Sequence, residues 1–260
     1  MSTTTAEMQY LQEQSRQPEM TAHLGALTPF QWLGAGVNDF NKAPGLSLLY
    51  GALFAAATAG AFLLALTLPW YAIAFLTGLV VLGPFMASGL YAASRDMEQG
   101  RAPTIRGSVK LLMERASYLA LFALMLSLVM AAWVRVSALV FAVKFNTLSP
   151  SIEAYTSMLS SADGWITLSF FAGMGFLLVS AVFIVSAVAI PMILDKDADF
   201  ITSMQTSYRA VTANPGAMTV WALVIVALTA IGIATAFIGL AVIFPVLGYA
   251  TWHSYRTLVK

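Results

Sequence analysis

The sequence has no cysteine, only two histidines and few charged residues. The cysteine count of 0 excludes disulfides, thiolate chemistry, iron–sulfur clusters and cysteine-type zinc sites. His23 and His253 lie at opposite ends of the chain, so we expect no multi-histidine metal site and no cofactor held by one. Charged residues make up 10% of the 260 residues, against about 25% in an average soluble domain. Such a low share cannot cover a water-exposed surface, which argues against both a soluble globular enzyme and a disordered chain.

Apolar residues dominate instead, at 59% of the chain with a mean hydropathy of +0.80. The formal net charge is +1, so no large electrostatic field attracts nucleic acid, and we expect no nucleic-acid partner. Residues 1–27 contain no apolar core of signal-peptide length. We predict that they form a polar, poorly ordered tail ahead of a single membrane domain over residues 28–260.

Uncharged apolar runs of about 20 residues predict membrane-spanning helices, because backbone amides cannot remain unpaired in hydrocarbon. The sequence contains six such runs, which predict an all-α, polytopic helical bundle with membrane lipids as its surroundings. The runs are Leu46–Leu68, Tyr71–Ser94, the segment between Arg115 and Arg135, Trp165–Leu194, Ala217–Ala236 and Phe237–Trp252.

The distribution of lysine and arginine predicts the orientation, since cytoplasmic loops carry an excess of both. With both termini cytoplasmic, only Arg135 and Lys144 of the 13 basic residues fall outside. The other basic residues all fall inside: Arg16, Lys42, Arg95, Arg101, Arg106, Lys110, Arg115, Lys196, Arg209, Arg256 and Lys260. The inverted topology violates the rule at several segments, so we predict six spans with both termini inside.

Short amphipathic segments between the spans suggest an internal repeat. One amphipathic segment has apolar residues at helical spacing, Phe30, Leu33, Val37 and Phe40, and is followed by Pro44-Gly45. The same pattern recurs 171 residues later, with Ile201, Met204, Tyr208 and Val211 followed by Pro215-Gly216. At a shift of 161, Pro84, Tyr91 and Arg95 fall on Pro245, Trp252 and Arg256. A weaker copy places Ile105, Val109 and Leu112 in the middle. The pattern predicts three units, 28–98, 103–195 and 198–260, each an interfacial amphipathic helix followed by a membrane hairpin.

Five residues are candidates for contacts with lipid or with a partner. At the ends of two predicted spans an aromatic residue precedes an arginine by one helical turn: Tyr91 before Arg95, and Trp252 before Arg256. This arrangement is typical of an anchor at the membrane interface, and it is also compatible with a specific site for an anionic lipid or substrate. Arg135 stands about 30 Å along a helix from Arg115, so its side chain either reaches the outer headgroups or lies inside the membrane as a functional group. His253 is interpreted as one more interfacial side chain.

Two charged segments outside the spans have simpler interpretations. Asp195, Asp197 and Asp199 resemble a calcium loop only superficially, because the glycine and terminal glutamate are missing; we predict a solvated loop with Asp199 near a helix start. The apolar excess after Arg135 predicts a helical pair that rises beyond the outer surface, with Ser149-Pro150 as a helix start. Glu153 and Asp163 would then be the partners for Arg135 and Lys144.

Three motifs resemble a known family. The stretches KAPGLSLLYG (42–51), GPFMASGLY (83–91) and SYRAVTANPG (207–216) together resemble the bacterial predicted integral membrane proteins of domain of unknown function 2189, over residues 28–258. The resemblance implies a multi-pass protein of the bacterial inner membrane without an established activity. Some members carry labels that link them to cytochrome c oxidase. Haem-copper chemistry needs several intramembrane histidines, which this chain lacks, so such a link would be that of an accessory or assembly protein.

No catalytic motif is recognisable in the sequence, and we expect no catalytic residue and no enzyme. Every Asp and Glu lies at or beyond a predicted membrane boundary, which disfavours ion-coupled transport. We therefore predict a non-catalytic interaction, accessory or assembly module of the inner membrane, with other inner-membrane proteins or a respiratory complex as candidate partners. The alternative is a facilitator or transporter of a small solute.

Overall fold

The computed structural model describes residues 20–67, 72–145 and 160–260, and this part of the chain is almost entirely helical. The short amphipathic segments form α2 (Thr28–Lys42), α5 (Ile105–Glu114) and α10 (Phe200–Ala213). The apolar segments form α3 (Pro44–Thr67), α4 (Ala72–Glu98), α6 (Ala116–Phe145), α8 (Ala162–Ser186), α9 (Ala189–Lys196), α11 (Pro215–Ala234) and α12 (Leu240–Leu258). The all-α prediction is confirmed for the described residues.

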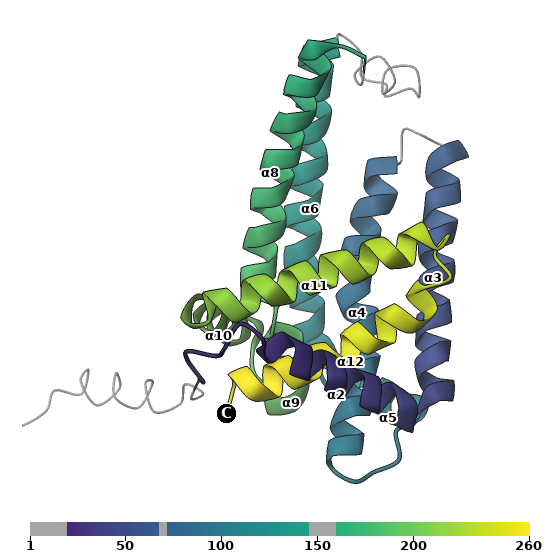
Figure 1. The fold of residues 1–260 in the computed structure, drawn as a ribbon, viewed down its shortest axis with the longest axis vertical. Helices are drawn as coiled ribbons and strands as arrows, with labels where there is room; N and C mark the ends of the chain where they lie inside the picture. Colours follow the sequence, from purple (N-terminus) through teal and green to yellow (C-terminus); the bar gives the residue numbers. More distant parts are fainter. Residues whose placement is uncertain (1–19, 68–71, 146–159) are drawn as a thin grey trace, which may run out of the picture.

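The long helices are arranged as pairs. Helices α3 and α4 pack against each other along the long axis of the molecule (Figure 1). Helices α6 and α8 run along the same axis, and the ring of Trp133 on α6 lies beside Gly175 on α8. Helices α11 and α12 cross these pairs obliquely, and α12 packs against α2, α3 and α4. The shorter helices α5, α9 and α10 gather toward the lower end of this view, where the chain also ends (Figure 1). We call this the basal end; the α6–α8 pair projects farthest from it.

Four segments are long and apolar enough to cross a membrane: Pro44–Leu64, Ala116–Leu139, Gly164–Lys196 and Pro215–Ala234. They correspond to the first, third, fourth and fifth predicted spans. The second predicted span corresponds to α4 and begins outside the described residues, and the sixth corresponds to α12. Neither of these two is among the four, so the structure supports several spans without establishing six.

The fourth predicted span is not one continuous helix. Helix α8 ends at Ser186 and α9 begins at Ala189, because Pro191 has no N–H for the carbonyl group of Ala187. Ser207 of α10 stabilises the break, since its hydroxyl donates to the carbonyl oxygen of Ile184 at 2.8 Å and accepts from the amide of Val188 at 3.4 Å. The residues of α9 from Ala189 to Leu194 are buried, and the helix forms the core of the basal end.

The turns that follow α2 and α10 have nearly the same backbone geometry. Ala43 (φ −135°, ψ 57°) separates α2 from α3, and Asn214 (φ −132°, ψ 50°) separates α10 from α11. The next residue is Pro44 in one case and Pro215 in the other, and proline is tolerated at a first helical position because that N–H has no intrahelical partner. These turns coincide at the predicted shift of 171 residues.

Helices α2 and α10 bury mostly small or polar residues, together with the larger Trp32 and Val211. In α2 the buried residues are Pro29, Trp32, Gly36 and Asp39, and in α10 they include Ser203, Ser207 and Ala210. Large apolar side chains of these helices and of α5 point outward and are about half exposed: Phe30, Ile105, Val109, Ile201 and Tyr208. Part of each predicted amphipathic face is therefore exposed. The rest of it faces inward, since Val211 is buried and Phe40, Leu112 and Met204 pack against the core.

Residues 20–27 do not belong to a loose tail, so the predicted boundary at residue 27 was placed too late. The amide of Thr21 donates to the carbonyl oxygen of Leu258 at 3.0 Å, and the amide of Leu24 donates to Asn214 Oδ1 at 2.9 Å. Met20 and Leu24 also pack against the core, which compensates for ordering the segment. The rest of the predicted tail, residues 1–19, lies outside the described residues.

Candidate functional site

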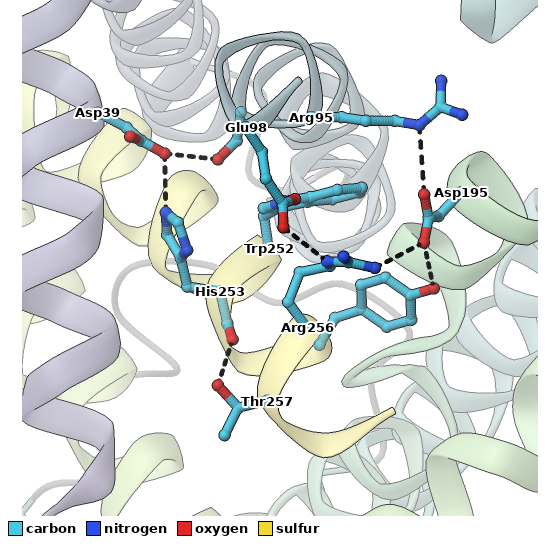
Figure 2. A network of polar contacts seen from close by, with 10 residues as sticks. Asp39, Arg95, Glu98, Asp195, Trp252, His253, Arg256 and Thr257 are labelled. Atoms are coloured by element: carbon cyan, nitrogen blue, oxygen red, sulfur yellow. Dashed lines mark hydrogen bonds and ion pairs between the residues drawn. The ribbon is translucent and has the colours of Figure 1, made fainter. Parts of the chain in front are cut away.

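A polar cluster at the basal end joins three helices through one carboxylate. Asp195, at the end of α9, accepts from Arg95 Nε of α4 at 3.3 Å through Oδ1. Its other oxygen, Oδ2, accepts from the hydroxyl of Tyr255 at 2.8 Å and from a terminal nitrogen of Arg256 at 3.3 Å, both on α12. Figure 2 shows Asp195 between the two arginines. The side chain of Asp195 is only 15% exposed, so these contacts are largely shielded from solvent.

A second carboxylate, Glu98, extends this arrangement at the end of α4. It accepts from Arg256 Nε at 3.0 Å and from the indole nitrogen of Trp252 at 3.1 Å. We call Arg95, Glu98, Asp195, Trp252, Tyr255 and Arg256 the Asp195 cluster. Burial alone would lower the pKa of Arg256, but the charges of Glu98 and Asp195 outweigh this effect and raise it. Burial and the neighbouring charge of Asp195 raise the pKa of Tyr255, so its phenol remains a proton donor.

A second cluster surrounds Asp39 of α2, whose side chain is only 4% exposed. Asp39 Oδ2 accepts from the hydroxyl of Ser94 at 2.6 Å and lies 2.8 Å from His253 Nε2 (Figure 2). Lys42 donates to Oδ1 at 3.0 Å. Burial raises the pKa of Asp39, but the hydrogen bonds from His253, Ser94 and Lys42 outweigh it, and the pKa is lowered. We call these four residues the Asp39 cluster.

Helical geometry on α12 separates the two clusters. Trp252 and Arg256 are four residues apart and share one face, from which both reach Glu98. His253 and Thr257 share the adjacent face, directed at α2, where the indole nitrogen of Trp32 donates to the hydroxyl of Thr257 at 3.1 Å. The end of α12 therefore binds α2 with one face and α4 and α9 with the next.

The chemistry of these clusters is that of cross-links between helices. Ser94 donates to Asp39 and not to His253, so the Asp39 cluster does not form the serine–histidine pair that nucleophilic catalysis requires. Within residues 20–67, 72–145 and 160–260, no group of three or more His, Cys, Asp or Glu side chains could hold a metal ion. Each cation named here faces a carboxylate, which favours a structural role.

The structure brings four of the five predicted site residues to this region. Arg95 and Arg256 belong to the Asp195 cluster, and Trp252 is fully buried beside Tyr255, with ring centroids 5.5 Å apart. Tyr91 is also buried, one turn before Arg95. The two aromatic rings thus lie inside the protein and do not project toward surrounding lipid. The predicted contacts of the two arginines with lipid or a partner stay a prediction.

Arg135 lies apart from the other four. It is exposed on the projecting part of α6, which continues as one helix to Phe145. The side chains of Lys144 and Asp163, and residue Glu153, lie outside the described residues, as does the predicted helix start at Ser149-Pro150. In the structure α8 begins at Ala162, where the hydroxyl of Ser161 accepts from the amide of Gly164 at 3.0 Å.

Sequence reasoning missed Asp39, Glu98, Asp195 and Ser94 as members of a site. Asp195 was predicted to be solvated, and this is wrong because α9 packs in the core and carries Asp195 to the two arginines. The prediction for Asp199 is confirmed, since its carboxylate accepts from the amides of Ile201 and Thr202, both at 3.0 Å, and caps α10. The one feature of the sequence that pointed to the Asp195 cluster was the repeat pattern, in which Arg95 and Arg256 occupy equivalent positions.

An apolar cavity of about 250 Å³ lies between the long helices, on the side of Tyr91 away from the Asp195 cluster. It is bounded by α3, α4, α8, α9, α11 and α12, and no charged residue lines it. A separate polar pocket of about 360 Å³ lies beside α5 and includes Arg95, Arg101 and Lys110. In this pocket Asp96 forms an ion pair with Arg101, and Glu114 lies 3.9 Å from Lys110. The charges that line the pocket are therefore largely balanced by one another.

Comparison with known proteins addresses the central part of the chain. Residues 71–195 match a family described as "Predicted integral membrane protein (DUF2189)". The DUF2189 segment covers α4 to α9 and includes Tyr91, Arg95, Arg135 and Asp195, so the protein is an integral membrane protein with several membrane-spanning helices. No curated protein and no solved structure matches the chain.

Proposed function

We propose that the protein is a non-catalytic interaction, accessory or assembly module of the bacterial inner membrane. The main support for this proposal is that the charged side chains of the two clusters at the basal end pair with one another. Asp195 and Asp39 each bind several partners from other helices, and the cavity between the long helices has no charged wall residue. Such an interior offers rigidity and no convergent acid, base or ion ligand.

The proposed architecture has six spans in three units, 28–98, 103–195 and 198–260, with both termini in the cytoplasm. Three observations support the repeat: the matching turns at Ala43 and Asn214, the prolines inside α4 and α12, and the common partner of Arg95 and Arg256. The excess of basic residues at the basal end supports its assignment to the cytoplasmic side.

Co-purification from membranes in a mild detergent tests the proposal. We expect a partner protein, such as a respiratory-complex subunit, to remain in fixed stoichiometry through two different chromatographic steps, with quantitative mass spectrometry as the measurement. A fully dissociated, monodisperse protein that also conducts a solute when it is reconstituted alone would contradict it. The same mass spectra test the oxidase link, because oxidase subunits would be among the retained proteins.

The alternative, a facilitator for a small solute, is favoured only by the apolar cavity, which lies among candidate spans. It predicts flux across vesicles that contain the purified protein and no partner. Ion-coupled flux is not expected from either proposal, because the wall of the cavity offers hydroxyl groups and no carboxylate.

A further inference from the structure

The apolar cavity has two kinds of wall. Most of its surface is hydrocarbon or aromatic, and the rings of Phe54 and Phe244 form part of it, stacked with centroids 3.9 Å apart. Hydroxyl groups occur at Tyr91, Ser186, Thr229 and Thr251. Several wall residues are only half buried, which shows that the cavity is partly open to the surroundings of the protein.

The position of the cavity determines what those surroundings are. Gly83 on its wall is 12 residues from Arg95 along α4, or about 18 Å from the basal charges. Thr229 lies in the last third of α11, about 21 Å from Pro215. Helices α3, α8 and α11 on its wall contain candidate spans. Because α11 crosses the other helices obliquely, the depth follows from α4, whose residue Gly83 lies well above the basal charges. We infer that this part of the wall lies among lipid tails, so that hydrocarbon is the medium at the opening.

Physical chemistry disfavours both an empty and a water-filled cavity at this depth. An empty space forfeits the dispersion contacts of its wall, and a water molecule needs two to four polar partners, which a mostly apolar wall does not supply. The volume of about 250 Å³ exceeds the roughly 150 Å³ of a cavity known to bind benzene. It stays below the range of about 300–1,000 Å³ that is typical of drug-sized ligands. This volume suits a segment of one hydrocarbon chain, and the uncharged, mostly apolar wall offers no partner to a charged headgroup.

Packing does not explain the glycine at position 83. A Cβ atom there would meet only the ring of Phe54, at an ordinary contact distance of 3.8 Å, so a side chain is sterically tolerated. By contrast, a Cβ at Gly248, also on the wall, would approach Leu90 to 2.7 Å, so that glycine is needed for helix packing. The missing side chain at Gly83 leaves volume in the cavity without any packing benefit.

We propose that this cavity is a binding site for one acyl chain of a membrane lipid. The chain enters from the bilayer through the open side and lies against Phe54, Trp221 and Phe244. The inference does not depend on the proposed accessory role, because a lipid-binding cavity is compatible with a module of any function.

Photochemical labelling in vesicles tests the site. The full-length protein is reconstituted in phosphatidylethanolamine that carries a diazirine midway along one acyl chain, irradiated, digested and mapped by mass spectrometry. Trp221 is the diagnostic residue, because it lines the cavity and is only 1% exposed. Leu223 and Val226 on the same helix are exposed to the surroundings and serve as internal controls. We expect adducts on all three.

The variant Gly83→Leu fills the cavity and should lose the Trp221 adduct while the adducts on Leu223 and Val226 remain. The matched control is Gly60→Leu on α3, which lies outside the cavity wall and has no atom within 4 Å of the place that a Cβ would occupy, and it should keep all three. Ile225→Phe fills the cavity from α11 and provides a second test if Gly83→Leu fails to fold. Retention of the two exposed adducts and a monodisperse elution profile verify folding.

Three results would overturn the proposal. They are a wild-type protein without an adduct on Trp221, an adduct that survives both cavity-filling substitutions, and loss of the adduct when an equimolar unlabelled isoprenoid is added. The last result would assign the cavity to an isoprenoid tail instead of an acyl chain. Retention of the adduct under this competition supports the acyl-chain assignment.

Discussion

Arg95 and Arg256 contact opposite oxygen atoms of the same carboxylate, that of Asp195, each at 3.3 Å. The two arginines end α4 and α12 at positions that the sequence pattern relates, and α9 supplies the anion between them. Two like charges are held close together by a single acidic side chain. Removal of that side chain therefore leaves two partly buried cations facing each other.

The substitution Asp195→Ala should destabilise the protein by about 2 kcal/mol, as expected for lost hydrogen bonds to charged groups. Thermal or denaturant unfolding in detergent measures the effect. The matched control is Glu114→Ala, whose side chain is 53% exposed and lies 3.9 Å from Lys110, so that its loss should cost less than about 1 kcal/mol. Equal effects of the two substitutions would contradict the central role assigned to Asp195.

The helical elements were predictable because their signals are local. Proline at positions 44 and 215 marks helix starts, and hydropathy alone located four segments that the structure retains as candidate spans. The break between α8 and α9 was not predicted, since Ser207 stabilises it from a distant helix. Apolar composition does not distinguish one long helix from two shorter ones.

The polar clusters were not predictable, because their partners are far apart in the sequence. Asp195 is 100 residues from Arg95 and 61 residues from Arg256, and Asp39 is 214 residues from His253. The sequence placed the basic residues at one side of the membrane but contained nothing that assigned a carboxylate to each. The same limitation explains why Tyr91 and Trp252, predicted as interfacial aromatics, lie in the interior.

The Asp39 cluster should make stability depend on acid pH. Because hydrogen bonds lower the pKa of Asp39 below its ordinary value of 3.8, the carboxylate stabilises the fold above about pH 4, and this contribution disappears as the pH falls through the folded-state pKa. Asp39→Asn should cost about 2 kcal/mol at neutral pH and reduce the loss of stability as the pH falls below about 4. Melting temperatures above and below this pH provide the measurement.

Asp199→Asn is the control for the neutral-pH effect of the Asp39 substitution, because the hydrogen bonds from Thr202 lower the pKa of Asp199 as well. Asp199 caps α10 at an exposed site, and asparagine caps a helix about as well as aspartate. Its neutral-pH stability should change little. If Asp39→Asn retained the full acid dependence of the wild type, the dominant titrating group would have to be elsewhere.

Gly51 should be intolerant of any side chain. A Cβ at this position would lie within van der Waals overlap of the backbone carbonyl of Ala241, because α3 and α12 cross in direct backbone contact there. We expect Gly51→Ala to destabilise the protein by about 1–3 kcal/mol, the range of overpacked interiors. Gly60→Ala on the same helix has no atom within 4 Å and should be nearly neutral. Similar melting temperatures for the two variants would contradict the observed crossing.

The absence of cysteine allows the proposed topology to be tested with single engineered thiols and no background. Arg101→Cys, at the basal end, should resist a membrane-impermeant maleimide in intact cells and react in inverted vesicles. Ile238→Cys should react from outside, because the ring of its neighbour Phe237 lies 5.3 Å from that of Phe62, near the far end of α3. Labelling of Arg101→Cys from outside would reverse the orientation. Protection of Ile238→Cys on both sides would show that α11 and α12 form a hairpin that stops within the bilayer, which would reduce the number of complete spans.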